Sequence, residues 1–148
     1  MDRKQRACEL FNQGYSCAQA VVGAFEDVLP YDLDTLLNIA IAFGGGFGRT
    51  RNLCGSVSAI GIVLGLKRAE EKANPQDKAS VYKLITECDN EFKARNKGLD
   101  NCGQLLQNVK NITEGYIPQT RDEQYYATRP CIKFVLDSVD IIQSKLGL

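Results

Sequence analysis

The sequence predicts an all-α protein, a single-domain helical bundle of about five to six helices that spans residues 1–148. Apolar residues recur three and four positions apart through most of the chain, as on one face of a helix. No segment shows the period of two that a half-buried strand needs. The composition, 44% hydrophobic and 24% charged, is that of an ordinary globular domain, and no repeat or composition shift marks a second one.

Two helical segments are predicted up to the glycine run at 44–46. The first carries an apolar stripe that is interrupted at Gly14 and stops at Pro30, since both residues disfavour a helix interior. The second begins at Asp32 or Asp34, because aspartate is a good N-cap, and it ends at the glycines. Consecutive glycines are unsuited to a helix interior, so we expect a loop there.

A third helix is predicted from about 52–56 to Glu71, and it contains the least polar stretch of the chain, 53–66. This stretch is shorter than the roughly 20 apolar residues that span a bilayer, so we expect a buried core helix. Gly61 and Gly65 would let a neighbouring helix approach it closely. No apolar signal segment follows the N-terminus, so we expect a cytoplasmic protein without membrane insertion.

The fourth predicted helix has the clearest start, with Asn74 as N-cap, Pro75 at the first helical position and Asp77 in the first turn. It is expected to end near Gly98. A short fifth helix is predicted at 101–106.

Residues 108–128 have no clear period, and we expect a long connection of the kind that is often functional or mobile. The neighbouring Tyr125 and Tyr126 would either cover the bundle or anchor this connection. A last helix then begins at about Pro130, since proline suits the first helical turn.

Charge and residue content exclude several classes of function. Eighteen basic residues balance eighteen acidic residues, so net charge gives no argument for nucleic acid or an acidic membrane surface as partner. Histidine is absent, which excludes Cys-His zinc fingers, Ser-His-Asp triads and Cys-His nucleophile pairs. Any metal must therefore take thiolate or carboxylate ligands, and a reactive thiolate must be activated by Lys, Arg or a helix N-terminus.

Four of the six cysteines lie at or near predicted helix starts: Cys17, Cys54, Cys102 and Cys131. Unpaired N–H groups and the helix dipole stabilise a thiolate at such positions. The cytosol keeps thiols reduced, so a structural disulfide framework is not the expected reason for them. No CxxC motif occurs, and neither a thioredoxin motif nor a zinc ribbon is predicted.

The other two cysteines, Cys8 and Cys88, lie on apolar helical stripes. Buried cysteine behaves as a small hydrophobic residue, so we predict that both are core thiols. Cys8 as a resolving thiol for Cys17 is the less favoured alternative.

The segment 14–21, GYSCAQAV, resembles the opening of the redox-active cysteine proteins labelled C_GCAxxG_C_C. The runs 43–49 and 54–66 are similar to the central block of that family, and Cys102 and Cys131 match its third and fourth cysteines. The resemblance covers nearly the whole chain. It implies an all-α fold and four cysteines that act as one set.

Within the central block the chain departs from the family pattern at two positions. Ser56 stands where alanine is typical and Ala59 where glycine is typical, and both changes preserve small side chains. Such proteins are similar to a module of split-Soret cytochromes, which implies an iron–sulfur centre. The chain has no CxxCH signature, so covalent haem is excluded.

The glycine run near Cys54 has two interpretations. Gly45, Gly46, Gly48 and Gly55 would present backbone N–H groups to an anion or to the sulfides of a bound cofactor. Alternatively, glycine lets the backbone pass closely beside the cysteines, which is the interpretation we favour. The run lacks the GK[ST] ending of a nucleotide-binding loop.

Three functions stay open at this point, and with them the question whether the protein is an enzyme. The leading hypothesis is metal or iron–sulfur ligation by the four cysteines, for electron transfer or redox sensing with an unknown redox partner. The second is a thiol–disulfide oxidoreductase that uses the same cysteines. The third is a structural zinc site in a helical interaction module. Small helical redox modules often pair, so we expect a homodimer.

Overall fold

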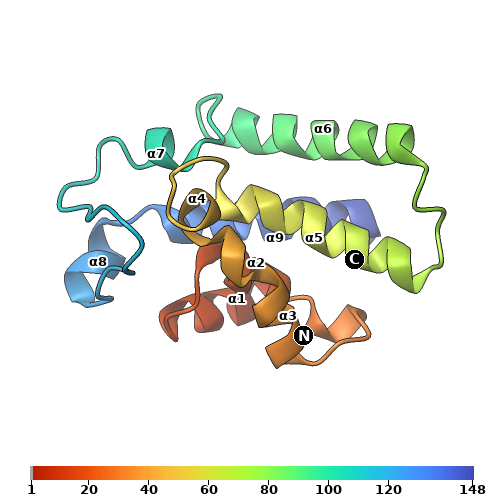
Figure 1. Ribbon diagram of the computed structural model, residues 1–148, viewed down its shortest axis with the longest axis horizontal. Coiled ribbons are helices and arrows are strands. Elements are labelled where there is room, and N and C mark those ends of the chain that lie inside the picture. The colour runs from red at the N-terminus through yellow and green to blue at the C-terminus, as the bar shows by residue number, and fades with distance from the viewer. Residues whose placement is uncertain (1) are drawn as a thin grey trace.

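The computed structural model describes residues 2–148, and this part of the chain is helical with no strand (Figure 1). The α-helices are α1 (Arg3–Asn12), α2 (Cys17–Gly23), α3 (Leu33–Ala40), α4 (Gly44–Phe47), α5 (Gly55–Glu70), α6 (Lys78–Arg95), α7 (Cys102–Leu105), α8 (Glu123–Thr128) and α9 (Cys131–Leu146), with two 3-10 turns, η1 (Glu26–Val28) and η2 (Ile41–Phe43). The predicted all-α class is confirmed, whereas the expected count of five to six helices is too low. The chain turns at Gly14 with a positive φ of 98°, so the first predicted segment is two helices.

The short helix α2 lies at the centre of the core, packed against α1, α3, α5 and α9 (Figure 1). All its residues after Cys17 are buried, and most of them are small. It begins with a capping box, in which Ser16 and Gln19 exchange side-chain and backbone hydrogen bonds. Gly23 permits the close packing, because a Cβ there would lie 2.7 Å from Leu10. The first cysteine therefore stands at the entrance of the most buried helix.

Helix α5 is the predicted core helix, with Val57, Ile60 and Val63 buried on its inner face. No helix of the described residues is long and apolar enough to cross a membrane. The prediction for Gly61 and Gly65 is wrong, since nothing lies within 4 Å of a Cβ added at either position.

Helix α6 runs along one side of the bundle, above α5 and α9 in Figure 1. Its buried residues are Cys88 and Phe92, and the Phe92 ring lies 6.1 Å from that of Phe134 on α9. The predicted start is corrected: Asp77 is the N-cap, whereas Asn74 accepts a hydrogen bond from the N–H of Gln76 in the preceding turn. Both aspartate and asparagine suit turns and caps, which is why the sequence misplaced the boundary.

The connection after α7 is held to the bundle at two places. The Arg49 guanidinium donates hydrogen bonds to the backbone carbonyls of Thr113, Gly115 and Ile117. The Tyr126 hydroxyl donates to the end of α1, and its ring packs edge-on against Phe11 at 5.8 Å. Contrary to the expectation of an irregular stretch up to residue 128, its last part is α8.

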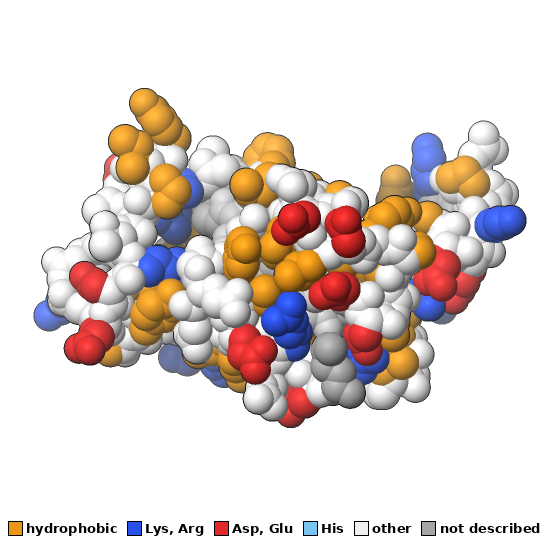
Figure 2. Space-filling view, turned by 90° about the horizontal axis from the view of Figure 1, so that it is seen from below, with side chains coloured by type: hydrophobic (Ala, Val, Ile, Leu, Met, Phe, Trp, Pro, Cys, Tyr) orange, Lys and Arg blue, Asp and Glu red, His pale blue; other side chains and the backbone are white. Residues whose placement is uncertain are grey.

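Charges of both signs are interspersed with apolar side chains on the face of the molecule in Figure 2. No single sign dominates that face, in accord with the balanced charge of the sequence.

Candidate functional site

All four predicted site cysteines lie at helix starts. Cys17, Cys102 and Cys131 are the first residues of α2, α7 and α9, and Cys54 is the N-cap of α5. The starts of α5 and α9 lie beside α4 at one end of the bundle (Figure 1). The positions predicted from the sequence are therefore confirmed, and the helices are neighbours: α2, α5 and α7 contact α4, and α9 packs against α2 and α5.

A single antiparallel bridge, Leu53 with Asn101, aligns two of the cysteines. Backbone hydrogen bonds from the N–H groups of Cys54 and Cys102 flank it, at 2.8 and 2.6 Å. Side chains alternate between the two faces of extended chain, so Cys54 and Cys102 share one face and Leu53 takes the other. Their burial agrees, because both cysteines are buried whereas Leu53 is 41% exposed.

Two glycines bring the backbone directly against the thiols. A Cβ on Gly55 would lie 2.9 Å from Cys17 Sγ and 2.7 Å from the Phe43 carbonyl. A Cβ on Gly46, which has a φ of 72°, would lie 2.7 Å from Cys102 Cβ. These distances are too short for any side chain, which supports the interpretation that the glycines serve close passage.

The other two glycines of the predicted cofactor loop differ from these. Gly45 lies under the side chain of Arg49, and nothing lies within 4 Å of a Cβ added at Gly48. The predicted end of the right-handed helix at the glycines is confirmed, because Gly44 is extended and Gly45, Gly46 and Phe47 have positive φ in the short turn α4. A cofactor role for Gly45, Gly46, Gly48 and Gly55 stays a prediction.

Cys17 is the thiol that its neighbours favour as a thiolate. Its pKa is lowered to about 6, chiefly because the Cys54 thiol donates a hydrogen bond to it. Burial opposes the shift, whereas the Ser56 hydroxyl, the backbone N–H of Ala18 and the charge of Arg121 support it. Ser56 is fully buried, and its hydroxyl oxygen has no hydrogen-bond partner among the described residues, although it lies near enough to Cys17 to lower the pKa of that thiol.

The partner thiols keep their protons. The pKa of Cys54 is well above its ordinary value, because its proton is held in the hydrogen bond to Cys17 and because it is buried. Burial and the nearby Cys17 raise the pKa of Cys131 to about 12, against the opposing charge of Arg129. Burial also raises the pKa of Cys102, although the Arg51 guanidinium lies 3.6 Å from its sulfur. One thiolate among neutral thiols is thus the favoured state near neutral pH.

A cluster of aromatic and cationic side chains, Arg121, Tyr125 and Arg129, lies near the thiols. The guanidinium groups of Arg121 and Arg129 stack on the Tyr125 ring, at 4.9 and 4.7 Å from its centre. Both positive charges lower the pKa of Cys131, and that of Arg121 also lowers the pKa of Cys17. The pair Tyr125 and Tyr126 therefore both anchors the connection and covers part of the bundle.

Of the two cysteines predicted to be core thiols, one is buried and the other is not. Cys88 is buried in the core, as predicted, and its pKa is raised by burial. Cys8 is only half-buried, because the buried face of α1 consists of Ala7, Leu10 and Phe11. The prediction of a core thiol is therefore wrong for Cys8, because this residue lies beside the buried face of α1 rather than on it.

Cys54 is the chief influence on the pKa of Cys17, and the negative charge of Cys17 in turn raises the pKa values of Cys102 and Cys131. Within residues 2–148 no group of three or more Cys, Asp or Glu side chains is arranged to hold a metal ion. Sequence reasoning missed Ser56 as a hydrogen-bond donor and Arg121 as a source of charge. Ser56 replaces the typical alanine two residues after Cys54, and this polar substitution was the signal in the sequence that could have indicated its role.

A family model with the description "Putative redox-active protein (C_GCAxxG_C_C)" matches residues 15–145, which include all four site cysteines. No curated protein matches the chain. No solved structure matches it either.

Proposed function

The chain belongs to the C_GCAxxG_C_C family, and from this premise we propose that it is a thiol–disulfide redox protein whose reactive pair is Cys17 and Cys54. The observation that carries the proposal is the close approach of the start of α5 to Cys17, where a Cβ on Gly55 would lie 2.9 Å from Cys17 Sγ and the neighbouring Cys54 thiol lowers the pKa of Cys17 to about 6. A thiolate is the nucleophile in disulfide exchange, and Cys17 is mostly thiolate at neutral pH. Its partner retains a proton beside it.

The reaction that fits this pair is reduction of a substrate disulfide. Cys17 Sγ bonds to one substrate sulfur, the substrate S–S bond breaks, and the other sulfur leaves as a thiolate that takes up a proton. Cys54 then loses its proton and attacks Cys17 Sγ, which forms the Cys17–Cys54 disulfide and releases the second substrate thiol. In total, two electrons pass from the two cysteines to the substrate, which takes one proton from Cys54 and one from solvent, because Cys17 starts as a thiolate.

The surroundings suit the first step. Cys17 is half-buried, whereas Cys54 is buried, so Cys17 is the more exposed thiol of the pair. The positive charge of Arg121 favours the thiolate and an approaching anionic substrate. Ser56 offers a hydroxyl to the same sulfur.

Metal or iron–sulfur ligation by Cys17, Cys54, Cys102 and Cys131 is the second candidate. Four thiols at helix starts and the absence of histidine favour it, because thiolates alone suffice for such centres. The donor set therefore suits the cofactor chemically. The described residues hold no group arranged around a metal, so we derive no reaction step through one. A structural zinc site would use the same ligands.

One experiment separates the two candidates. The protein is purified without oxygen, analysed for iron, sulfide and zinc, and then equilibrated in buffers of graded thiol–disulfide potential before peptide mapping. We expect a reversible two-electron transition that produces a Cys17–Cys54 disulfide, lost in Cys17→Ser and in Cys54→Ser and retained in Cys88→Ala. Thiols that stay free at every potential would refute the proposal. Stoichiometric iron and sulfide, lost on substitution of any of the four cysteines, would favour the second candidate.

A further inference from the structure

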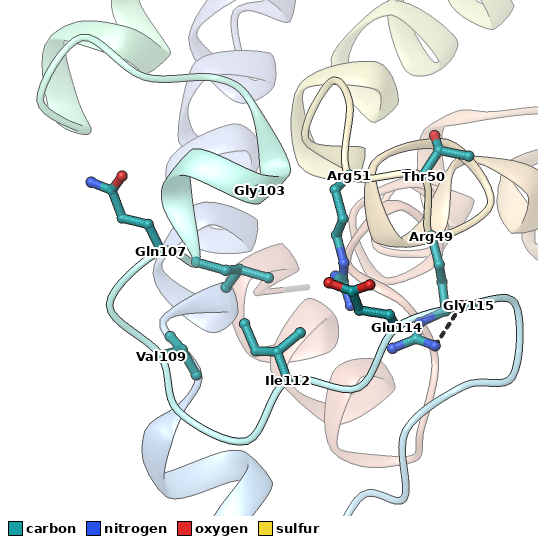
Figure 3. Close-up of a pocket in the computed structure, with 10 residues that line it drawn as sticks. Arg49, Thr50, Arg51, Gly103, Gln107, Val109, Ile112, Glu114 and Gly115 are labelled. Atoms are coloured by element: carbon teal, nitrogen blue, oxygen red, sulfur yellow. Dashed lines mark hydrogen bonds between the residues drawn. The ribbon is translucent and has the colours of Figure 1, made fainter.

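A pocket of about 490 Å³ lies beside α7 and is lined by Gly103, the residue that follows Cys102 (Figure 3). It is formed by the segment around Arg51, by α7 and by the connection that follows α7. The charged and apolar side chains that line it include Arg49, Arg51, Leu106, Val109, Ile112 and Glu114. Gly103, the residue after Cys102, also lines it, so the pocket reaches the backbone of the thiol site.

The two arginines of the pocket differ in their hydrogen-bond partners. The Arg49 guanidinium is occupied by carbonyls of the connection and thereby holds the wall in place. The Arg51 guanidinium donates a single hydrogen bond within the described chain, to Cys102 Sγ at 3.6 Å. Neither arginine takes part in any ion pair of residues 2–148. Arg51 therefore has free guanidinium N–H donors to offer to an anion beside a thiol.

The remaining lining complements this charge. Figure 3 shows the Glu114 carboxylate near the Arg51 and Arg49 side chains, with Val109 and Ile112 along the other wall. A cation site, an anion site and an apolar wall in one pocket match an amino-acid group, whose carboxylate pairs with Arg51 and whose ammonium pairs with Glu114. The volume is sufficient for a small disulfide with such ends.

We propose that this pocket binds a low-molecular-weight disulfide with amino-acid end groups, and that Arg51 holds the carboxylate so that a ligand sulfur faces Cys102. The inference rests on the proposed thiol chemistry and names its substrate class. Cys102 releases its proton and attacks as the thiolate that Arg51 favours, so that its Sγ bonds to one ligand sulfur, the ligand S–S bond breaks, and the other half leaves as a thiolate that takes up the released proton. Cys54, on the same face of the bridge, then attacks Cys102 Sγ and releases the second half as a thiol.

The first test compares a charged with a neutral disulfide. Rates of thiol oxidation are measured with cystine and with 2-hydroxyethyl disulfide, and their ratio cancels changes in thiol reactivity. We expect Arg51→Gln to lower this ratio about tenfold, the factor that corresponds to one lost charge-assisted hydrogen bond. In Arg51→Lys the ratio of the two rates should lie between those of wild type and Arg51→Gln, because the positive charge is kept. Lys83→Gln, which removes a positive charge from an exposed position on α6, should leave it unchanged.

The second test separates the pocket from the chemistry. Lanthionine, the monosulfide analogue of cystine, cannot exchange, and its binding is followed by the methyl resonances of Leu106, Val109 and Ile112. Binding that Arg51→Gln and Glu114→Gln both weaken, together with a cystine adduct on Cys102 in Cys54→Ser, supports the inference. An Arg51→Gln ratio equal to that of wild type, with no lanthionine binding, overturns the inference and leaves the proposed function intact. If lanthionine binds but the protein exchanges no disulfide, both the proposed thiol–disulfide function and the disulfide substrate of the pocket are overturned.

Discussion

Cys17 and Cys88 lie in two regions of the molecule that shift the pKa of a cysteine thiol in opposite directions. At the end formed by the starts of α2 and α5, the Cys54 thiol is the chief cause that lowers the pKa of Cys17 to about 6. In the core under α6, Cys88 is surrounded by apolar groups, and burial raises its pKa. The difference teaches that hydrogen-bond donors, rather than burial, decide which thiol can react.

The glycines of α5 show the same contrast in packing. Gly55, at the thiol end, lies against Cys17 and the Phe43 carbonyl, whereas Gly61, further along the helix, has nothing within 4 Å of an added Cβ. Glycine at the first position permits a contact, and at the second it only adds backbone freedom.

The largest expected effect comes from adding one methyl group to these two glycines. Gly55→Ala should destabilise the fold by about 1–3 kcal/mol, since the Phe43 backbone must move to admit the methyl group. Gly61→Ala, the matched control, should stabilise it by about 0.5–1 kcal/mol, because alanine is the better helix former. Chemical denaturation of both variants measures the difference. Equal effects at the two positions would refute the contrast.

The next effect concerns the reactivity of Cys17 without its donor. In Cys54→Ala the main cause of the lowered pKa is gone, so alkylation of Cys17 by iodoacetamide at pH 7 should slow about tenfold as the thiolate fraction falls. The wild-type value of about 6 is the reference. Cys88→Ala should alkylate at Cys17 as fast as wild type. A rate that does not change in Cys54→Ala would show that the donor has no such influence.

A smaller effect is expected in the pH dependence of stability. Between about pH 6 and the ordinary thiol value of 9.0, Cys17 is ionised in the folded chain but protonated in the unfolded chain. The unfolded state then binds more protons, so the free energy of unfolding should rise with pH across this window. The chain has no histidine, so none titrates there.

Above about pH 9 the sign reverses, because Cys54 and Cys131 have raised pKa values and the unfolded chain ionises first. Denaturation of wild type and Cys17→Ser at intervals of pH checks both statements. The rise between pH 6 and 9 should be absent in Cys17→Ser, and its persistence there would assign it to another group.

The smallest effect is local. Arg49→Gln should release the connection after α7, since three carbonyls lose their donor, and a protease should then cleave it faster. The midpoint of global unfolding should change little, with Lys83→Gln as the control. Cleavage at the wild-type rate would show that other contacts hold the connection.

The sequence predicted the helical class and the helix-start positions of the four cysteines because both depend on local signals. Pro130 before Cys131 and Asn101 before Cys102 are capping residues that act within one turn. The misplaced start of α6 shows where local signals compete, because Asn74 and Asp77 can both cap.

The relations among the cysteines could not be predicted in this way. Hydrogen bonding between Cys17 and Cys54, and the charge that Arg121 brings to them, join segments far apart in the chain, and only packing decides such contacts. The half-buried position of Cys8 depends likewise on how α1 is rotated against α2. The sequence therefore identified the reactive residues but not the pair among them.

A titration that resolves all six thiols tests the central claim most directly. The native, reduced protein is pulsed with iodoacetamide at intervals from pH 5 to pH 10, and the labelling of each cysteine is measured by peptide mass spectrometry. We predict that Cys17 reacts first, with a midpoint near its pKa of about 6, while Cys54, Cys88 and Cys131 stay unlabelled until well above pH 8. Labelling of Cys17 no faster than that of Cys88 at pH 7 would contradict the account.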